Sequence, residues 1–333
     1  MTSVLLDARL AVRGLGIATF VERLVEALRA AGVATHLWQG TAEWGPRARL
    51  ATLTRSGLFD VSPRLDPRTR GFDVVHFASN LASLAPGANS VVTVHDLFHR
   101  RRGRARARDR VTGAVLEKSL PHAGRVVAVS DRTRSELEQA VPSLRGRIEV
   151  VPHGMRRLPP PAGARPHVLA FGGAGDPRKR TDLMVAVYRE YRASTPGALP
   201  LVVLSRAGLT AAQRSALAAS GARIVPSATR AEVDALMAGA AALLYPTTEE
   251  GFGLPILEAA EVGTPVVVDG AARVATEVLG RHCFAVHESS VDAWVSQLHR
   301  AVAAAPVSDA LDLPDWTTVA AAYRSFYAEV GRH

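Results

Sequence analysis

The sequence predicts an α/β protein made of two lobes, each built around a parallel β-sheet. The chain has 333 residues, which is more than the roughly 250 to 300 at which a single hydrophobic core stops growing. Short apolar runs alternate with amphipathic stretches, as in βαβ units. The pattern occurs twice, on either side of a segment rich in proline. Together these observations predict two Rossmann-like lobes joined by a linker.

The first half of the chain accounts for one lobe. Its apolar runs predict strands at 4–10, 35–38, 73–78, 90–96, 125–130 and 148–154. Amphipathic stretches between some of these runs, such as Ile17 to Ala30, predict helices. Residues 158–166, LPPPAGARP, contain four prolines and are typical of a linker. The first domain is therefore assigned to 1–157 and the linker to 158–166.

The second half repeats the pattern. Strands are predicted at 167–173, 199–205, 222–226, 242–247, 265–270 and 283–287. A last helix is predicted from Trp316 to Val330, because its apolar residues recur at a spacing that gives one buried face. The second domain is assigned to 167–315, and 316–333 form a closing helix.

The net charge of +9 raises nucleic acid and anionic membranes as partners. Only Lys118 and Lys179 are lysines among the 40 basic residues, a bias typical of codon usage more than of design for one partner. The dense cluster at 99–110, HRRRGRARARDR, has no interleaved aromatics on which bases could stack. Nucleic acid is therefore not expected as a partner. The cluster is interpreted as a solvated loop, with docking on an anionic lipid surface or an acidic acceptor as the alternative.

The composition also bears on the compartment. No apolar run approaches the 18 residues that indicate a membrane span, and Asp7 and Arg9 stand where a secretory peptide would be apolar. Cys283 is the only cysteine, so an intrachain disulfide is excluded. We expect a cytoplasmic protein, which would meet a membrane only at its inner face.

The stretch EEGFGLPILEAAEVGTPVVV, residues 249–268, carries the clearest functional signal. It follows one predicted strand and leads through a short helix, about Pro255 to Val262, into the next. Gly251 and Gly253 allow close backbone approach to a ligand, and the helix N-terminus offers unpaired N–H groups. Gly263 suits the end of the helix.

Glu250 and Glu258 lie beside this turn, and their carboxylates would accept hydrogen bonds from hydroxyl groups. The alternative is an ordinary crossover with two solvated glutamates. Phe252 argues against that alternative, because an exposed aromatic between two glycines has no packing reason.

Other residues suggest parts of a site in the first domain. Gly14 and Gly16 fall at a strand-to-helix turn, where a helix N-terminus could face a diphosphate. Thr19 occupies the third glycine position of a dinucleotide fingerprint, which therefore fails. His95 ends a predicted strand, with a hydrogen-bonded structural histidine as the alternative.

No metal site is expected. His282, Cys283 and His287 are separated by a predicted strand and have no evident fourth ligand. No Asp-x-Asp motif occurs in the chain.

The 249–268 stretch resembles the E-x7-E signature of the retaining family 4 glycosyltransferases, which have the GT-B fold. Further segments resemble that family and occur in its order. They are 7–28, DVVHF at 73–77, VTVHDL at 92–97, VVAVSDRTRSEL at 126–137, VVPHG at 150–154, GDPRKR at 175–180 and WTTVAAAYRSFY at 316–327.

The resemblance implies two lobes facing across a cleft, with the acceptor on the first, the sugar nucleotide on the second and the last helix packing back toward the first. It implies that Glu250 binds hydroxyls of the donor sugar and Glu258 the ribose. The backbone of 251–254, Gly251, Phe252, Gly253 and Leu254, would line the sugar and diphosphate. Lys179 would supply positive charge to the leaving diphosphate, and His95 would lie near the donor sugar.

One departure concerns the loop after the first strand of the second domain. Many family members have a phosphate-binding arginine where this sequence has Gly173 and Ala174. Glycine N–H groups, Arg178 or Arg180 would take its place. In the first domain, Gly16 is placed on the donor side, and Gly14 and His76 are candidates on the acceptor side.

The expected reaction is metal-independent, retaining transfer of a sugar from a nucleoside diphosphate to an acceptor hydroxyl, without a cofactor. The donor is expected to resemble GDP-mannose, with UDP- or dTDP-sugars next. The acceptor would be a glycan, a lipid-linked glycan or a small-molecule scaffold. Alternatives are a nucleotide-sugar epimerase or a phosphorylase on the same fold, a module that binds anionic surfaces or nucleic acid, and an inactive relative that only binds.

Overall fold

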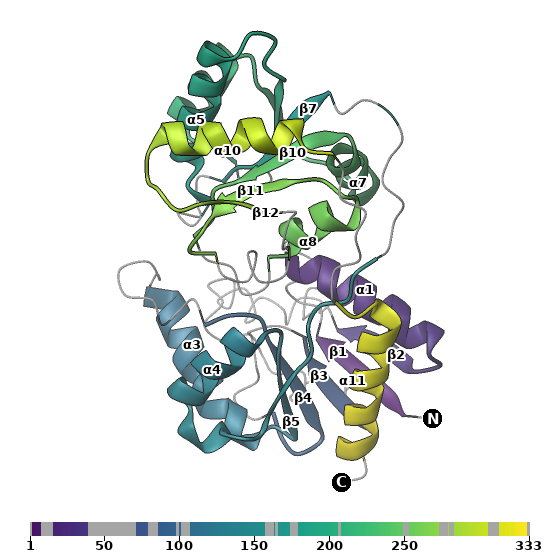
Figure 1. The fold of residues 1–333 in the computed structure, drawn as a ribbon. Coiled ribbons are helices and arrows are strands. Elements are labelled where there is room, and N and C mark those ends of the chain that lie inside the picture. Colours follow the sequence, from purple (N-terminus) through teal and green to yellow (C-terminus); the bar gives the residue numbers. More distant parts are fainter. Residues whose placement is uncertain are drawn as a thin grey trace, which may run out of the picture. The chain divides into compact units, whose positions relative to one another are not determined.

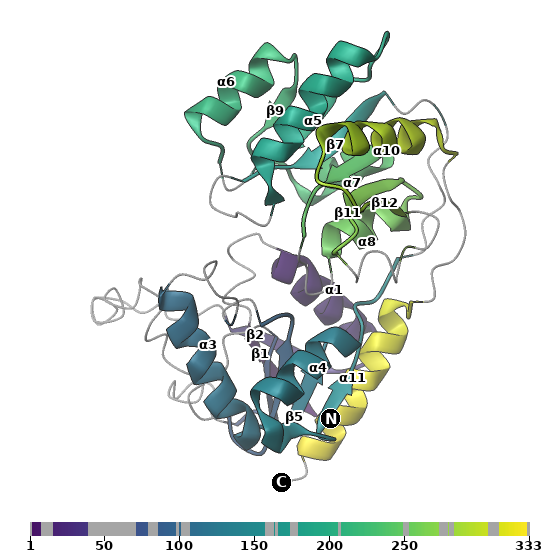
Figure 2. The same ribbon diagram turned by 60° about the vertical axis from the view of Figure 1, so that its left-hand side comes forward.

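The chain forms two compact units in a computed structural model (Figures 1 and 2). Unit 1 comprises Met1–Gly154 with Pro314–His333, and unit 2 comprises Met155–Leu313. The predicted linker lies almost wholly outside the described residues. The structure describes residues 2–7, 16–38, 71–78, 86–97, 100, 107–156, 163, 166–173, 179–205, 208–248, 253–272, 279, 283–305 and 313–331.

Unit 1 contains a parallel sheet with six strands among its described residues, in the order β2-β1-β3-β4-β5-β6. Its strands are nearly continuous apolar runs, as expected for parallel strands buried on both faces. Each lies within a predicted run or starts one residue earlier. The strands are β1 (Ser3–Asp7), β2 (Ala34–Trp38), β3 (Val74–Phe77), β4 (Ser90–Val94), β5 (Arg125–Ala128) and β6 (Ile148–Val150).

Helices cover both faces of this sheet (Figures 1 and 2). One face carries α1 (Gly16–Ala30) and α11 (Trp316–Val330), which pack side by side. The other carries α3 (Ala107–Ser119) and α4 (Asp131–Ala140), whose leucines join the core formed by alternate strand residues. Short 3-10 turns lie at Leu120–His122 and Pro142–Leu144.

The predicted last helix is confirmed, and it belongs to unit 1. Asp315 caps its N-terminus by accepting a hydrogen bond from the Thr318 N–H at 2.7 Å. Its buried residues include Val319, Tyr323 and Tyr327, which recur every four residues and form one stripe along the helix. The buried face contains Val319, Tyr323 and Val330 of the predicted set, while Ala322 and Phe326, also predicted to be buried, are partly exposed.

Unit 2 has a second parallel sheet of six described strands, in the order β12-β11-β10-β7-β8-β9. All six fall at predicted runs or within two residues of them. They are β7 (His167–Phe171), β8 (Leu201–Leu204), β9 (Arg223–Val225), β10 (Ala240–Tyr245), β11 (Val266–Asp269) and β12 (Cys283–Val286).

Two hydrophobic cores lie on the two faces of the unit 2 sheet. One core involves α5 (Thr181–Ser194), α6 (Ala211–Ala219) and α10 (Val291–Ala303), and α5 lies beside α10 (Figure 1). The other involves α7 (Arg230–Ala238) and α8 (Leu254–Glu261). The prediction of two α/β lobes with parallel sheets is therefore confirmed.

A buried polar cluster lies between the unit 1 sheet and α11. The ring nitrogens of His76 contact the Tyr327 hydroxyl and Thr93 Oγ1, each at 2.8 Å. The Tyr323 hydroxyl contacts the same Thr93 oxygen at 2.9 Å. His76 is fully buried, and this burial, with a smaller contribution from His95, lowers its pKa to about 3.

This cluster predicts acid sensitivity. Between pH 6.5 and about 3 the unfolded chain binds a proton at residue 76 that the folded chain does not, so the free energy of unfolding falls as the pH falls. For His76 alone the loss is about 2 kcal/mol at pH 5. Burial also lowers the pKa of His95 and His153, which adds to the effect.

The measurement is a urea titration at pH 7, 6 and 5, read by hydrogen exchange of peptides from β3 and β4 so that unit 1 is followed by itself. His76→Gln, whose amide can still bond to both hydroxyls, should flatten the pH dependence. His122→Gln, at an exposed position, is the matched control and should leave it unchanged. An equal pH dependence in all three proteins would contradict the assignment.

Candidate functional site

The strand order of unit 2 indicates where a ligand binds. Read from β9 to β12 and counted in chain order within the unit, the strands follow the order 3-2-1-4-5-6 of dinucleotide-binding sheets. The switch point lies between β7 and β10. Ligands of such sheets bind outside the carboxyl ends of the strands at the switch point. β7 leads into the segment of Gly173 and Lys179, and β10 leads into the turn before α8. The two segments that carry the strongest sequence signals therefore flank the switch point.

The turn before α8 depends on glycine. Gly253, the N-cap residue, has φ +79° and ψ +55°, a left-handed conformation that is costly for residues with a β-carbon. Leu254 begins the helix and Pro255 follows in its first turn, where its missing N–H costs nothing. Gly263, also left-handed at φ +67°, follows the helix end. The predicted helix is confirmed to within one residue, while Glu250, Gly251 and Phe252 lie outside the described residues.

Glu258 lies on α8 with a side chain that is only 11% exposed. Arg230 at the start of α7 donates a hydrogen bond from Nη1 to its Oε1. Burial raises the pKa of Glu258, and the positive charge of Arg230 opposes that rise. The second predicted glutamate is thus a mostly buried carboxylate paired with a cation.

This ion pair is part of a larger network, which sequence reasoning missed. Arg230 also donates to Asp234, one turn further along α7. Asp234 accepts two hydrogen bonds from the guanidinium of Arg156, at 3.2 and 3.3 Å. Glu261 accepts from the backbone N–H of Arg156 at 2.6 Å and from its Nε at 3.2 Å. The only sequence signal is the spacing of Arg230 and Asp234, four residues apart on one helix.

The segment after β7 contains Lys179 and Arg180, which precede α5. Lys179 is partly exposed, and no carboxylate in the described part of the chain forms an ion pair with it. Arg180 is left-handed, with φ +44°, and its guanidinium contacts Asp269 at 2.6 Å and lies 5.9 Å from the centre of the Trp294 ring. Of these two cations, Lys179 is the one that no described carboxylate engages, so it is better suited than Arg180 to bind a phosphate.

The geometry narrows what could replace the missing phosphate-binding arginine. The Gly173 N–H already donates to Thr181 Oγ1 at 3.1 Å, and Arg180 is held by Asp269. Both alternatives are engaged within unit 2. Arg178, the third, lies outside the described residues, as does Ala174.

In unit 1, His95 follows β4 directly and is 7% exposed. Its Nε2 lies 3.2 Å from the Ala78 carbonyl oxygen, and the Phe20 ring packs edge-on against it at 4.9 Å. Burial lowers its pKa, so the ring is neutral near pH 7. Gly16 is the first residue of α1, and Gly14 lies outside the described residues.

His76 is a correction to the predicted acceptor side. Its ring is fully buried and both nitrogens are engaged by Tyr327 and Thr93. Neither ring nitrogen is available to bind an acceptor substrate, so His76 belongs to the core of unit 1. Its place within an apolar run gave no indication of these partners, which come from distant parts of the chain.

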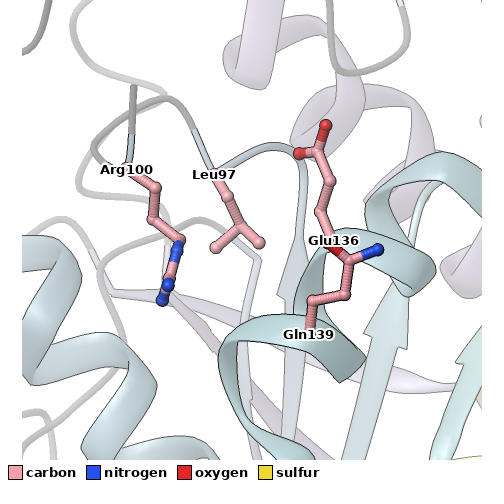
Figure 3. Close-up of a pocket in the computed structure, with 4 residues that line it drawn as sticks. All are labelled: Leu97, Arg100, Glu136 and Gln139. Carbon is pink, nitrogen blue, oxygen red and sulfur yellow. The ribbon is translucent and has the colours of Figure 1, made fainter. Parts of the chain in front are cut away.

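A small pocket of about 170 Å³ lies in unit 1, close to the end of β4. Figure 3 shows Leu97 between Arg100 on one side and Glu136 and Gln139 of α4 on the other. Arg100 is paired with Glu117 at 2.8 Å. Glu136 is paired with Arg132 at 2.9 Å. These paired groups and the Gln139 amide surround one apolar side chain and suit a ligand with hydroxyl groups. Most of the predicted arginine cluster lies outside the described residues.

The described residues contain neither a group of metal-binding side chains nor a helix that could span a membrane. No three of their histidine, cysteine, aspartate or glutamate side chains are grouped so that they could hold a metal ion. No helix among them has the length and apolar character needed to cross a membrane.

Comparisons with known proteins match both halves of the chain. Residues 15–157 match the model described as Glycosyltransferase Family 4, and residues 165–304 match the model described as Glycosyl transferases group 1. No curated protein matches the chain in sequence.

Solved structures of glycosyltransferases resemble this one in fold. A sucrose-phosphate synthase from Thermosynechococcus elongatus matches with a TM-score of 0.76 and 17% identity over 99% of both chains. WaaG, a glycosyltransferase involved in lipopolysaccharide biosynthesis, matches with a TM-score of 0.63 and 17% identity over 99% of this chain and 98% of that one. A mutant of S. aureus TarM, in complex with Fondaparinux, alpha-GlcNAc-glycerol and UDP, has a TM-score of 0.50 and 10% identity over 74% of this chain and 52% of that one.

Proposed function

The chain belongs to the family 4 glycosyltransferases, which have the GT-B fold, and we propose that it moves a sugar from a nucleoside diphosphate to an acceptor hydroxyl with retention at the anomeric carbon. The observation that carries this proposal is the switch point of unit 2. There a mostly buried carboxylate, Glu258, and a cation free of ion pairs within the described residues, Lys179, follow the neighbouring strands β10 and β7. A ribose and a diphosphate need these two kinds of group.

The roles of the residues follow from their chemistry. Glu258 accepts hydrogen bonds from the ribose, and Glu250 accepts them from the sugar. The N-terminus of α8, entered through Gly253 and Leu254, offers N–H groups to the donor phosphates. Lys179 stabilises the negative charge that grows on the diphosphate as it leaves. His95, which follows β4 directly and is neutral near pH 7, is assigned to the donor sugar.

The bond changes can be written without a protein nucleophile. The bond between the anomeric carbon and the diphosphate oxygen breaks, and the acceptor oxygen attacks the same face of the sugar. The acceptor proton passes to the departing diphosphate. Catalysis then depends on orientation and on electrostatic stabilisation of the leaving group, and no metal ion or cofactor enters the proposal.

The donor is proposed to resemble GDP-mannose, and UDP- and dTDP-sugars are the alternatives. The acceptor is a hydroxyl-bearing glycan, lipid-linked glycan or small-molecule scaffold, and the pocket beside Leu97 is its proposed place on unit 1. A cytoplasmic location, with peripheral contact to an anionic membrane through the arginine cluster, completes the proposal.

The test incubates the protein with a panel of GDP-, UDP- and dTDP-sugars and simple glycoside acceptors, with and without EDTA, and reads the anomeric configuration of the product by NMR. Retained configuration and activity in EDTA are expected. A product that forms only with free phosphate would indicate a phosphorylase, and conversion of the donor to another sugar nucleotide would indicate an epimerase. Salt-sensitive binding to anionic vesicles without any turnover would favour a surface-binding module.

A further inference from the structure

The Glu258 carboxylate needs a cation at its present position. Its side chain is 11% exposed, and a carboxylate buried to this degree takes up a proton unless a positive group or several donors stabilise the charge. Within the described residues, the one hydrogen bond to this side chain comes from Arg230 Nη1 to Oε1. Arg230 therefore sets both the charge and the orientation of the carboxylate.

Arg230 is in turn held in place. Its Nη2 donates to Asp234 on the same helix, and Asp234 is bound by two nitrogens of Arg156. Arg156 is anchored by Glu261, whose side chain is 5% exposed and lies three residues after Glu258 on α8. These five residues form a network of ion pairs that connects α7 to α8. The network fixes the orientation of the Arg230 guanidinium.

The two oxygens of Glu258 then have different tasks. Oε1 is occupied by Arg230. Oε2 accepts no hydrogen bond from any described residue, and this oxygen is not fully buried. An ionised oxygen in this situation is suited to accept hydrogen bonds from a diol.

We propose that Arg230 is a positioning residue for donor binding: it keeps Glu258 charged and turned so that Oε2 meets the ribose hydroxyls of the nucleoside diphosphate. The proposal rests on the proposed function, which assigns the ribose to Glu258. The competing interpretation gives Arg230 a purely structural task as a link between α7 and α8. The two differ in whether the loss of Arg230 changes recognition of the ribose or stability alone.

The experiment measures ribose recognition directly. Binding of GDP and UDP, each beside its 2′,3′-dideoxy analogue, is followed by calorimetry, and the affinity ratio of the two forms reports the ribose contacts. Wild type should favour the ribose form by at least tenfold. Arg230→Ala should bring the ratio close to one, and Arg230→Lys should restore part of it because it returns the positive charge.

Arg125→Ala is the matched control, since it removes an arginine that pairs with two glutamates in unit 1, away from α7 and α8. It should retain the ratio, whereas Asp234→Asn, which removes one anchor of Arg230, should lower the ratio by less than Arg230→Ala does. An unchanged ratio in Arg230→Ala, with a lowered melting temperature, would overturn the proposal and leave Arg230 as a structural link.

The pH dependence gives a second readout. The charged groups that face Glu258 are Arg230 and Asp234 from α7 and Glu261 from its own helix. Protonation of Glu258 at low pH removes the ribose contacts, so the ratio falls as the pH falls. Arg230→Gln should move the midpoint of that fall to higher pH, because the cation that opposes the burial is gone. Since both nucleotides carry the same diphosphate, its own titration cancels, and an unmoved midpoint would contradict the proposal.

If Arg230→Ala fails to fold, Arg230→Lys and Arg230→Gln test the proposal instead. Their readouts are the affinity ratio of the ribose and dideoxyribose forms and the pH midpoint at which that ratio falls. A wild-type protein that binds neither diphosphate overturns the proposed function itself. A wild-type protein that binds both but does not distinguish ribose from dideoxyribose overturns the ribose assignment and the role of Arg230 together.

Discussion

Glu258→Gln is expected to weaken binding of the free nucleoside diphosphate, whereas Glu250→Gln is expected to lower kcat and leave that binding largely intact. Glu258 is assigned to the ribose, which is chemically inert, so its contacts are similar before and during the reaction. Hydrogen bonds to a charged group contribute about 1.5 to 3 kcal/mol, and much of the effect should appear in KM. The neutral amide also removes one of the two carboxylates that pair with Arg230, which adds to the loss of binding.

Glu250 is assigned to the sugar, whose ring distorts toward the transition state. Contacts that orient the anomeric carbon gain strength in that state, so their loss falls on kcat. Calorimetry with the diphosphate and steady-state kinetics with the donor separate the two roles. Equal effects of the two substitutions on binding of the free diphosphate would contradict this division.

Lys179→Ala is expected to reduce kcat by roughly a hundredfold, the size of effect seen when one group that stabilises a developing charge is removed. The diphosphate carries more charge as it leaves than in the bound donor, so the affinity for the intact donor should fall much less. Lys179 is suited to this role by its position between the end of β7 and α5 and by the absence of a carboxylate partner in the described part of unit 2.

The chain supplies its own control, because it has one other lysine. Lys118 lies in the last turn of α3 and is exposed, so Lys118→Ala should leave kcat unchanged. Lys179→Arg should restore part of the rate, since it returns the charge with a different shape. Turnover of Lys179→Ala equal to that of wild type would remove this residue from the mechanism.

The fold could be predicted because each of its helices and strands has a recognisable pattern of residues that are close together in the sequence. Parallel strands that are buried on both faces become short apolar runs, and β10, AAALLY, is buried at all six positions. The bounds of α8 follow from Gly253 and Gly263, which take the left-handed conformations on either side of it. The spacing of Val319, Ala322, Tyr323, Phe326 and Val330 predicts α11, and the structure buries three of these five, Val319, Tyr323 and Val330.

What could not be predicted depends on contacts between distant residues. Arg230 and Glu258 are 28 residues apart and meet only because α7 and α8 pack on the same face of the sheet. His76 contacts Tyr327, which is 251 positions away in the sequence. The sequence alone therefore could not distinguish a buried structural histidine from one that binds the acceptor. Arg180 has a left-handed backbone and a guanidinium that pairs with Asp269. The sequence gives no local signal for this conformation, in which glycine or asparagine is usual.

The division of unit 1 between the two ends of the chain has a consequence for synthesis on the ribosome. Unit 2 is one continuous segment, Met155–Leu313, whereas unit 1 needs Pro314–His333 to be complete. Domains fold as units while the chain is made, usually the earlier one first. Here unit 2, although translated second, has all its residues before unit 1 receives α11. Until then Thr93 and His76 lack the tyrosine hydroxyls that bond to them in the folded protein, and the part of the sheet that α11 covers stays uncovered.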